Sequence, residues 1–228
     1  MSMSLILSSR DKFNHGVKLI LASQSPRRRE ILDMMGLAGL YTAQPSPLDE
    51  TALQIRLAQS TDITPQEYTL RLAQEKSKAL ALQLSDDAST TSTLVLGSDT
   101  IVDLDGMILE KPIDEASAKL MLESLSSKSH QVHTAVALYH VVGTTYTLVD
   151  SFVDTAQVTF ASLREDDILN YIATQEPMDK AGSYGIQGIG GQFVESISGD
   201  FFSVMGLPMH RTSKLLTKGL ETAMGQSH

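Results

Sequence analysis

The chain has 228 residues, of which 42% are hydrophobic and 20% are charged, and its formal net charge is −9. It contains no cysteine, which excludes disulfide scaffolds, thiolate metal sites and cysteine nucleophiles. The negative charge argues against broad electrostatic binding to a nucleic acid polymer or to a membrane surface. An anion can still bind to such a protein where a few basic side chains cluster in one cleft.

We expect neither a membrane-spanning helix nor a secretory signal. No apolar run approaches the roughly 18 residues that a spanning helix needs, and the start of the chain lacks the apolar core of a signal peptide. The lack of cysteine is compatible with a reducing compartment, so we expect a cytoplasmic protein. Residues 1–16 are interpreted as an N-terminal extension with a frayed start, ahead of one domain over residues 17–228, and a targeting segment is the alternative.

A strand and a helix are predicted at the start of this domain. Residues 17–22 form a short apolar run that is typical of a buried strand. Ser25 and Pro26 follow at once and suit the N-cap and the first position of a helix over residues 26–35. Gly36 is expected to end that helix.

The rest of the chain continues to alternate between helix and strand patterns. Thr64-Pro65-x-Glu67 has the form of a capping box, and Asp105-Gly106 is a strong hairpin signal. The first half is expected to contain a helix from the capping box to residue 84, a polar loop over 85–92, strands over 94–96, 100–104 and 107–109, and a helix over 114–125. The second half is expected to contain paired strands over 132–142 and 146–160, a helix from a second capping box at Ser162 to residue 174, a glycine-rich loop over 180–191 and a helix from residue 208. This order predicts an α/β or α+β fold with a mixed sheet, arranged as a single domain with two lobes around a cleft.

The turn Ser23-Gln24-Ser25-Pro26-Arg27-Arg28-Arg29 has the composition of an anion site. Hydroxyls, free backbone N–H groups, the positive end of a helix and three guanidinium groups come together in it. Arg27 and Arg28 could clamp phosphate oxygens through paired hydrogen bonds. The alternative is a capped helix whose arginines are only solvated.

Gly97-Ser98-Asp99-Thr100 places a carboxylate at the end of a predicted buried strand. Enzymes with α/β folds place ligand-binding and catalytic groups in such positions. Asp99 could bind Mg²⁺ or Mn²⁺ through oxygen, or polarise a water molecule, and the pair Asp49-Glu50 could supply a second carboxylate. The alternatives are an aspartate that bonds its own turn and a solvated acidic pair.

Two lysines could reach the same cleft. Lys111 directly follows the predicted hairpin, in Glu110-Lys111-Pro112. Lys76 lies at helical spacing from Leu72, toward the apolar face of the long predicted helix. Its stem should therefore be buried, with the amine directed into a groove. Solvated lysines without a function are the alternative.

The segment that starts at Asp179-Lys180 is rich in glycine, since five of the ten residues from 182 to 191 are Gly. Such a loop lets the backbone approach a ligand closely, and Gln187 offers a donor and an acceptor for a base edge. The loop lacks the Lys-Ser/Thr ending of a P-loop, and a flexible surface loop is the alternative. The histidines form no convincing metal pair, and Ser25 has no histidine at hydrolase spacing.

Five ordered motifs together resemble the Maf family of nucleoside triphosphate pyrophosphatases, also known as septum-formation-inhibitor homologues. The resemblance extends from about residue 17 to residue 220. The motifs are Leu21-Ala22-Ser23-Gln24-Ser25-Pro26-Arg27-Arg28, Gly97-Ser98-Asp99-Thr100, Glu110-Lys111-Pro112, Asp179-Lys180-Ala181-Gly182-x-Tyr184-Gly185-Ile186-Gln187-Gly188 and Phe201-Phe202-Ser203-Val204-Met205-Gly206-Leu207-Pro208.

The resemblance implies a single α/β domain with an elongated mixed sheet and a deep cleft between two lobes, similar to the inosine triphosphate pyrophosphatase fold. It implies hydrolysis of a nucleoside triphosphate to a nucleoside monophosphate and pyrophosphate with a divalent metal, Mg²⁺ or Mn²⁺. Removal of excess or non-standard nucleotides would be the purpose of that reaction. The resemblance also implies a homodimer.

Roles for individual residues follow from the same resemblance. Asp99 matches the proposed proton acceptor and Glu50 a second acidic position, and both are expected to hold the metal. The positions on the phosphate side are Ser23, Arg28, Lys76, Lys111 and Lys180. The positions associated with substrate choice in the dTTP/UTP branch are Arg27, Thr100 and Gln187.

Three other functions stay open at this point. The 7-methyl-GTP branch of the family tends to carry Trp where Arg27 stands and Gln where Thr100 stands, so this chain resembles the dTTP/UTP branch more closely. A nucleotide-binding regulator of cell division with little turnover is an alternative from another class. A protein-interaction scaffold is a third, although it would not need the arginine-rich turn.

Overall fold

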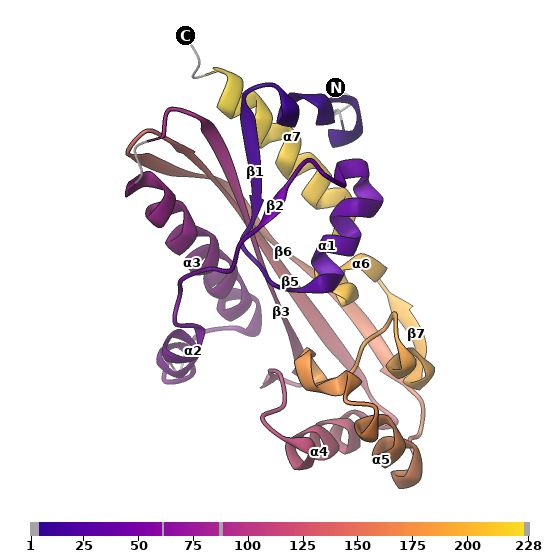
Figure 1. The fold of residues 1–228 in the computed structure, drawn as a ribbon. Coiled ribbons are helices and arrows are strands. Elements are labelled where there is room, and N and C mark those ends of the chain that lie inside the picture. Colours follow the sequence, from indigo (N-terminus) through magenta and orange to yellow (C-terminus); the bar gives the residue numbers. More distant parts are fainter. Residues whose placement is uncertain (1–4, 61, 87–88, 226–228) are drawn as a thin grey trace.

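A long mixed sheet runs through the part of the chain that the computed structural model describes, residues 5–60, 62–86 and 89–225 (Figure 1). Its strands lie in the order β2-β1-β3-β5-β6-β7, and β4 pairs with β3. β1 is parallel to β2 and β3, whereas the other neighbours are antiparallel. The strands are β1 (Val17–Leu21), β2 (Thr42–Ala43), β3 (Ser92–Leu104), β4 (Met107–Leu109), β5 (Ser129–Val142), β6 (Thr145–Phe160) and β7 (Val194–Ser198).

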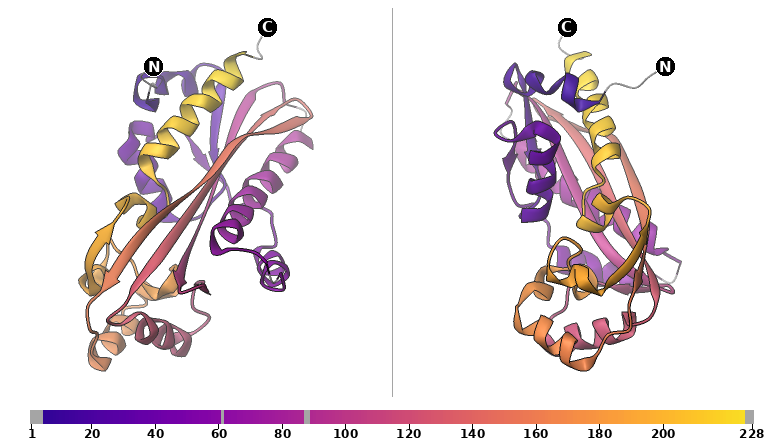
Figure 2. Two further views of the ribbon diagram at one scale, coloured as in Figure 1. Left: turned by 180° about the vertical axis from the view of Figure 1, so that it is seen from behind. Right: turned by 90° about the vertical axis from the view of Figure 1, so that its right-hand side faces the viewer.

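Helices cover both faces of this sheet. Figure 2 shows α3 along one face of the long strands and α7 along the other, with α4 and α5 together at one end. No helix within the described ranges combines the length and the apolar character of a membrane span. The helices are α1 (Pro26–Leu32), α2 (Glu50–Ala58), α3 (Pro65–Asp86), α4 (Glu115–Leu125), α5 (Glu165–Ala173), α6 (Phe201–Met205) and α7 (Met209–Gly225).

The two largest apolar cores among the described residues lie at the two ends of the sheet. One packs α1, α7 and β1 around Leu96 and Leu138, and the other packs α4 and α5 around Val102 and Phe160. Because β3 and β5 contribute to both cores, the two lobes are the two ends of one continuous sheet. The predicted single α/β domain with an elongated mixed sheet is thus confirmed.

The paired strands, the hairpin at Asp105-Gly106 and the capping box at Thr64 are confirmed. The helix expected over residues 26–35 differs, because it ends at Leu32 and continues as one π turn, Asp33–Leu37. The capping box expected at Ser162 is wrong: α5 begins after Arg164 without a side-chain cap.

The strand expected to stop at residue 96 also differs from the structure. Residues 97–99 continue the pairing with β5, for example Gly97 with Ala137 and Asp99 with Ala135, so β3 is one uninterrupted strand. Of the polar loop expected over 85–92, residues 87–88 lie outside the described residues, while the ends of the loop belong to α3 and β3.

The N-terminal segment packs on the domain from residue 5 onward. Ile6 and Phe13 are buried in the same core as Leu96, and the Ile6 N–H donates to Ser213 Oγ of α7 at 2.9 Å. The expectation of a frayed start is therefore wrong for residues 5–13. The two apolar side chains lie in separate short 3-10 turns, Ile6–Ser8 and Arg10–Asn14, and the sequence around them carries no sustained apolar periodicity.

Gly97 allows α3 to lie directly on β3. A Cβ at this position would lie 2.7 Å from Ser77 Cβ and 2.9 Å from the carbonyl oxygen of Ala73, which is helix backbone. We expect Gly97→Ala to lower the free energy of unfolding by about 1–3 kcal/mol, because the helix must move away from the strand. Urea unfolding measures the change. Gly225→Ala is the control, since its Cβ would meet nothing within 4 Å, and an equal loss in both variants would contradict the prediction.

Candidate functional site

A cleft of about 700 Å³ opens between the two ends of the sheet. It forms where the edge of β3 has no neighbouring strand: β1 pairs with β3 as far as Leu96, and β4 pairs with it from Val102 onward. Among the described residues, no strand covers that edge over 97–101. All ten side chains singled out in the sequence line this cleft: Ser23, Arg27, Arg28, Glu50, Lys76, Asp99, Thr100, Lys111, Lys180 and Gln187.

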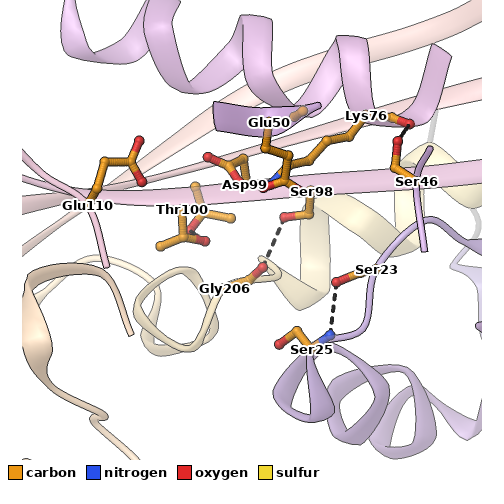
Figure 3. Close-up of polar contacts among 12 residues, drawn as sticks. Ser23, Ser25, Ser46, Glu50, Lys76, Ser98, Asp99, Thr100, Glu110 and Gly206 are labelled. Atoms are coloured by element: carbon orange, nitrogen blue, oxygen red, sulfur yellow. Dashed lines mark hydrogen bonds and ion pairs between the residues drawn. The ribbon is translucent and has the colours of Figure 1, made fainter. Parts of the chain in front are cut away.

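An ammonium group lies between two carboxylates at the centre of the cleft (Figure 3). Lys76 Nζ of α3 contacts Asp99 Oδ1 of β3 and lies 2.8 Å from Glu50 Oε2 at the start of α2. The side chains of Lys76 and Asp99 are 8% and 10% exposed, whereas that of Glu50 is 40% exposed. Burial by itself lowers the pKa of Lys76, but the charges of Asp99 and Glu50 outweigh it and hold the pKa above its ordinary value. Lys76 is therefore a cation at neutral pH.

The strand alternation divides the polar side chains of this part of β3 between the two faces of the sheet. Asp99 faces α3, while Ser98 and Thr100 face the other way, where Ser98 Oγ donates to the carbonyl oxygen of Gly206 at 3.0 Å. Thr100 Oγ1 shares a hydrogen bond of 2.8 Å with Thr134 Oγ1. A ligand that crosses the open edge of β3 can thus contact both sets of groups.

Arg28 of α1 is fixed by three acceptors on that second face. Its Nε donates to the Gly206 carbonyl at 3.0 Å, and its terminal nitrogens donate to Ser23 Oγ at 3.2 Å and Thr100 Oγ1 at 3.4 Å. Desolvation by burial lowers its pKa, yet an arginine stays charged under these conditions. The guanidinium is thus a permanent, oriented positive charge. Ser25 precedes α1 as predicted, but its side chain makes no capping hydrogen bond.

Arg27 and Lys180 meet at Asp179, a residue to which the sequence analysis gave no role. Arg27 donates to both the side chain and the carbonyl oxygen of Asp179 at 3.3 Å, and Lys180 Nζ donates to the other side-chain oxygen at 2.6 Å. The contact joins α1 to the segment on the opposite wall of the cleft. It holds two cations close to the opening where Gln187 lies.

Glu176 fastens the glycine-rich loop, and its role was also missed. Its carboxylate accepts hydrogen bonds from the N–H groups of Ile189 at 2.9 Å and Gly190 at 3.2 Å, and from Tyr171 OH at 3.0 Å. Glu176 lies 13 and 14 residues from these N–H groups in the sequence, so no local sequence pattern predicts the contacts. The loop with Gln187 is a sequence of anchored 3-10 turns, unlike the flexible surface loop considered as the alternative.

Glu110 is a further carboxylate in the cleft, besides Glu50, Asp99 and Asp179. Tyr68 OH donates to its Oε1 at 2.8 Å. Burial, with a smaller contribution from the charge of Asp99, raises the pKa of Glu110 to about 7. One signal in the sequence could have indicated Glu110, namely its place beside Lys111 in a family motif. Nothing in the sequence indicated its contact with Tyr68.

The raised pKa of Glu110 predicts a loss of stability with rising pH. The folded protein binds this proton more tightly than the unfolded chain does, so the stabilisation is complete below pH 4.5 and is lost as the pH rises through about 7. Glu110→Gln keeps the acceptor for Tyr68 and cannot ionise. The quantity to measure is the free energy of unfolding of the variant minus that of the parent, in buffer without metal. We expect this difference to be roughly 2–3 kcal/mol larger at pH 8 than at pH 4.5. A difference that does not depend on pH would contradict the assignment.

The cleft offers hard oxygen ligands for a cation. Within the described part of the chain, no three His, Cys, Asp or Glu side chains are placed to hold a metal ion. Glu50 and Asp99 nevertheless converge on one positive charge, the Lys76 ammonium, which stands in for a cation. Two carboxylates suit Mg²⁺ or Mn²⁺ when phosphate oxygens and water complete the coordination, so the residues present fit such an ion.

Comparisons with known proteins point to one family. The family described as Maf-like protein matches residues 18–219. A dTTP/UTP pyrophosphatase of Shewanella oneidensis is 47% identical over 205 residues, which are 89% of this chain and 98% of the relative. A dTTP/UTP pyrophosphatase of Bacillus velezensis is 43% identical over 199 residues, 87% of this chain and 95% of the relative. The solved structure of a HAM1 protein from Coxiella burnetii is 16% identical, with a TM-score of 0.39, and covers 92% of this chain and 100% of its own.

The family match includes most of β1 and of α7, and it contains every side chain that lines the cleft. The bacterial relatives align over nearly their whole length. Both findings confirm the resemblance that the five motifs indicated, and the chain belongs to the family of Maf-like proteins.

Proposed function

We propose that this protein is a nucleoside triphosphate pyrophosphatase that cleaves dTTP and UTP between the α and β phosphates, with Mg²⁺ or Mn²⁺. The observation that carries the proposal is the convergence of ten side chains, spread from residue 23 to residue 187, on one cleft. The bacterial relatives that align over nearly their whole length are named dTTP/UTP pyrophosphatases, which supports the same reaction.

The phosphates would lie along the cations of the cleft. Arg28 offers an oriented guanidinium, and Lys76 and Lys111 offer ammonium groups, which offset the negative charge that develops on phosphate oxygens in the transition state. Ser23 and Lys180 complete this side of the site. A bound metal would add positive charge at the same oxygens.

Asp99 would receive a proton from the attacking water. The water oxygen bonds to the α phosphorus, the bond from that phosphorus to the bridging oxygen breaks, and pyrophosphate leaves. Asp99 is suited to this role because it is buried in the cleft and, among the described residues, forms side-chain hydrogen bonds through Oδ1 alone, which leaves Oδ2 for the water. Glu50 and Asp99 would hold the metal.

The base would lie toward Arg27, Thr100 and Gln187. A pyrimidine such as uracil or thymine presents two carbonyl acceptors and one N–H donor, which an amide, a hydroxyl and a guanidinium can satisfy together. A site built for those groups rejects bases that leave its polar atoms unpaired. We therefore expect dTTP and UTP to be preferred over ATP and GTP by roughly tenfold or more in kcat/KM, about 1.4 kcal/mol.

Replacing Gln187 tests this base site. We expect Gln187→Ala to reduce the preference for dTTP over ATP more strongly than it reduces kcat for dTTP, because an amide that reads the base contributes to selection and not to bond cleavage. The ratio of kcat/KM values measures the effect. Gln192→Ala is the matched control, since Gln192 belongs to the same segment but does not line the cleft. An unchanged ratio in Gln187→Ala, or a parent enzyme that prefers a purine, would overturn the dTTP/UTP assignment.

A panel of nucleoside triphosphates assayed for pyrophosphate release, with Mg²⁺ or Mn²⁺, tests the reaction itself. We expect release from dTTP and UTP. Binding of these nucleotides without release would favour the regulator of cell division, and highest activity on 7-methyl-GTP would favour the other branch of the family. The homodimer and the cytoplasmic location stay predictions from the sequence, and light scattering in solution tests the first.

A further inference from the structure

Lys76 occupies the position that the proposed metal would need. Its Nζ contacts Asp99 and lies 2.8 Å from Glu50, so both carboxylates assigned to the metal share one ammonium group. The side chain is 8% exposed, and its cationic form is stabilised by these same carboxylates. A divalent ion and an ammonium group cannot both lie between two carboxylates, because their like charges repel at that distance.

The backbone of Lys76 is fixed, whereas its long side chain can change conformation. Leu72, Ala73 and Leu80 of α3 are fully buried, and the carbonyl oxygen of Lys76 accepts a hydrogen bond from Ser46 Oγ at 2.8 Å (Figure 3). Four rotatable side-chain bonds can nevertheless carry the ammonium several ångströms into the open cleft. Leaving the carboxylates is costly for a buried ammonium unless it meets another anion.

A triphosphate supplies that anion. It brings three to four negative charges to the cleft that Lys76 lines. We propose that Lys76 holds the cation position between Glu50 and Asp99 in the nucleotide-free protein, and gives it up to the metal only when the phosphates draw its ammonium away. The inference rests on the proposed function. Its consequence is an order of binding, in which the metal enters together with the nucleotide and binds poorly before it.

Mn²⁺ binding to the nucleotide-free, full-length protein tests this inference without any turnover. Free Mn²⁺ is measured by electron paramagnetic resonance at pH 7.5 for the parent, Lys76→Met and the double variant Glu50→Gln with Lys76→Met. We expect Lys76→Met to bind Mn²⁺ at least about tenfold more tightly than the parent, because the competing charge is gone, and the double variant to lose that gain.

Lys78→Met is the matched control. Lys78 lies on the same helix, is 44% exposed and pairs with Glu75 at 3.7 Å, outside the cleft. The Lys78→Met variant loses the same charge from α3 as Lys76→Met does. We expect its Mn²⁺ affinity to stay within about twofold of the parent, because an exposed charge is screened by solvent and salt. Parent-like affinity in a folded Lys76→Met, or an equal gain in Lys78→Met, would overturn the inference.

The parent protein gives a second test that needs no variant. If nucleotide-free parent protein binds Mn²⁺ with a Kd of about 10 µM or tighter, as preformed sites for divalent cations do, Lys76 does not block the site and the inference fails. This result is independent of the panel of nucleotides, because a parent that releases no pyrophosphate defeats the proposed function whatever its Mn²⁺ affinity.

Discussion

Asp99→Asn is expected to lower kcat for dTTP by at least about 100-fold, because it removes the charge that accepts a proton or holds the metal at the reacting phosphate. The amide has the shape of the carboxylate, so β3 can keep its pairing with β5. Lys76 keeps Glu50 as an ionic partner at 2.8 Å, which limits the loss of folding stability. Steady-state pyrophosphate release and urea unfolding separate the two effects.

The control for this variant lies on the same strand. Asp103 is four residues further along β3 and contacts His133 Nε2 at 3.2 Å, outside the cleft. We expect Asp103→Asn to retain kcat within a few-fold, whatever its cost in stability. Near-normal turnover in Asp99→Asn would remove Asp99 from the mechanism, and an equal loss in both variants would indicate a general effect of charge on the strand.

Arg28→Ala is expected to lower kcat/KM for every accepted nucleotide by roughly 10- to 150-fold, which corresponds to about 1.5–3 kcal/mol for a desolvated, charge-assisted contact. The loss should be the same for dTTP and UTP, because the guanidinium is assigned to phosphate and not to the base. Arg28 also connects Ser23, Thr100 and Gly206, so a lower free energy of unfolding is expected as well.

Two comparisons separate binding of phosphate from support of the fold. Arg28→Lys keeps the charge but cannot reach three acceptors at once, so we expect it to recover only part of the activity. Arg29→Ala changes the next residue, which is exposed and does not line the cleft, and should leave kcat/KM unchanged. If Arg28→Ala keeps parental kcat/KM for all nucleotides, the phosphates bind elsewhere.

The sequence predicted those parts of the fold that local patterns determine. The apolar run at β1, the capping box at Thr64 and the hairpin at Asp105-Gly106 each lie within a few residues of the element that they predict. The break expected at Gly97 is absent because pairing with β5 on the neighbouring strand outweighs the weak strand preference of Gly-Ser.

Four helices and strands escaped prediction because their patterns are weak. β2 has only two residues, Thr42–Ala43. α2 buries only Leu53 among its nine residues, and its cap at Asp49 belongs to the acidic pair for which a solvated loop was the alternative. β7 has a mostly exposed sequence and pairs with β6 alone, and α6 has only five residues. Elements as short and polar as these are determined by tertiary contacts.

The site residues were predicted more completely than their partners. All ten side chains proposed from the sequence line one cleft, and eight of them belong to charged or glycine-rich motifs whose unusual composition stands out in a sequence. Three carboxylates were missed because each contacts a residue that is distant in the sequence. The contacts are Asp179 with Arg27, Glu176 with Gly190 and Glu110 with Tyr68. Such contacts leave no local pattern.

The uncovered edge of β3 has a consequence for solubility. An exposed strand edge offers backbone N–H and C=O groups to any other extended chain, and so favours aggregation. Here the opening covers only residues 97–101, with β1 on one side and β4 on the other. A segment this short cannot form a stable ladder with an approaching strand, because isolated pairing over so few residues is marginal in water. The fold can therefore leave this short stretch of β3 without a strand partner beside the cleft, while keeping its backbone from acting as a template for fibrils.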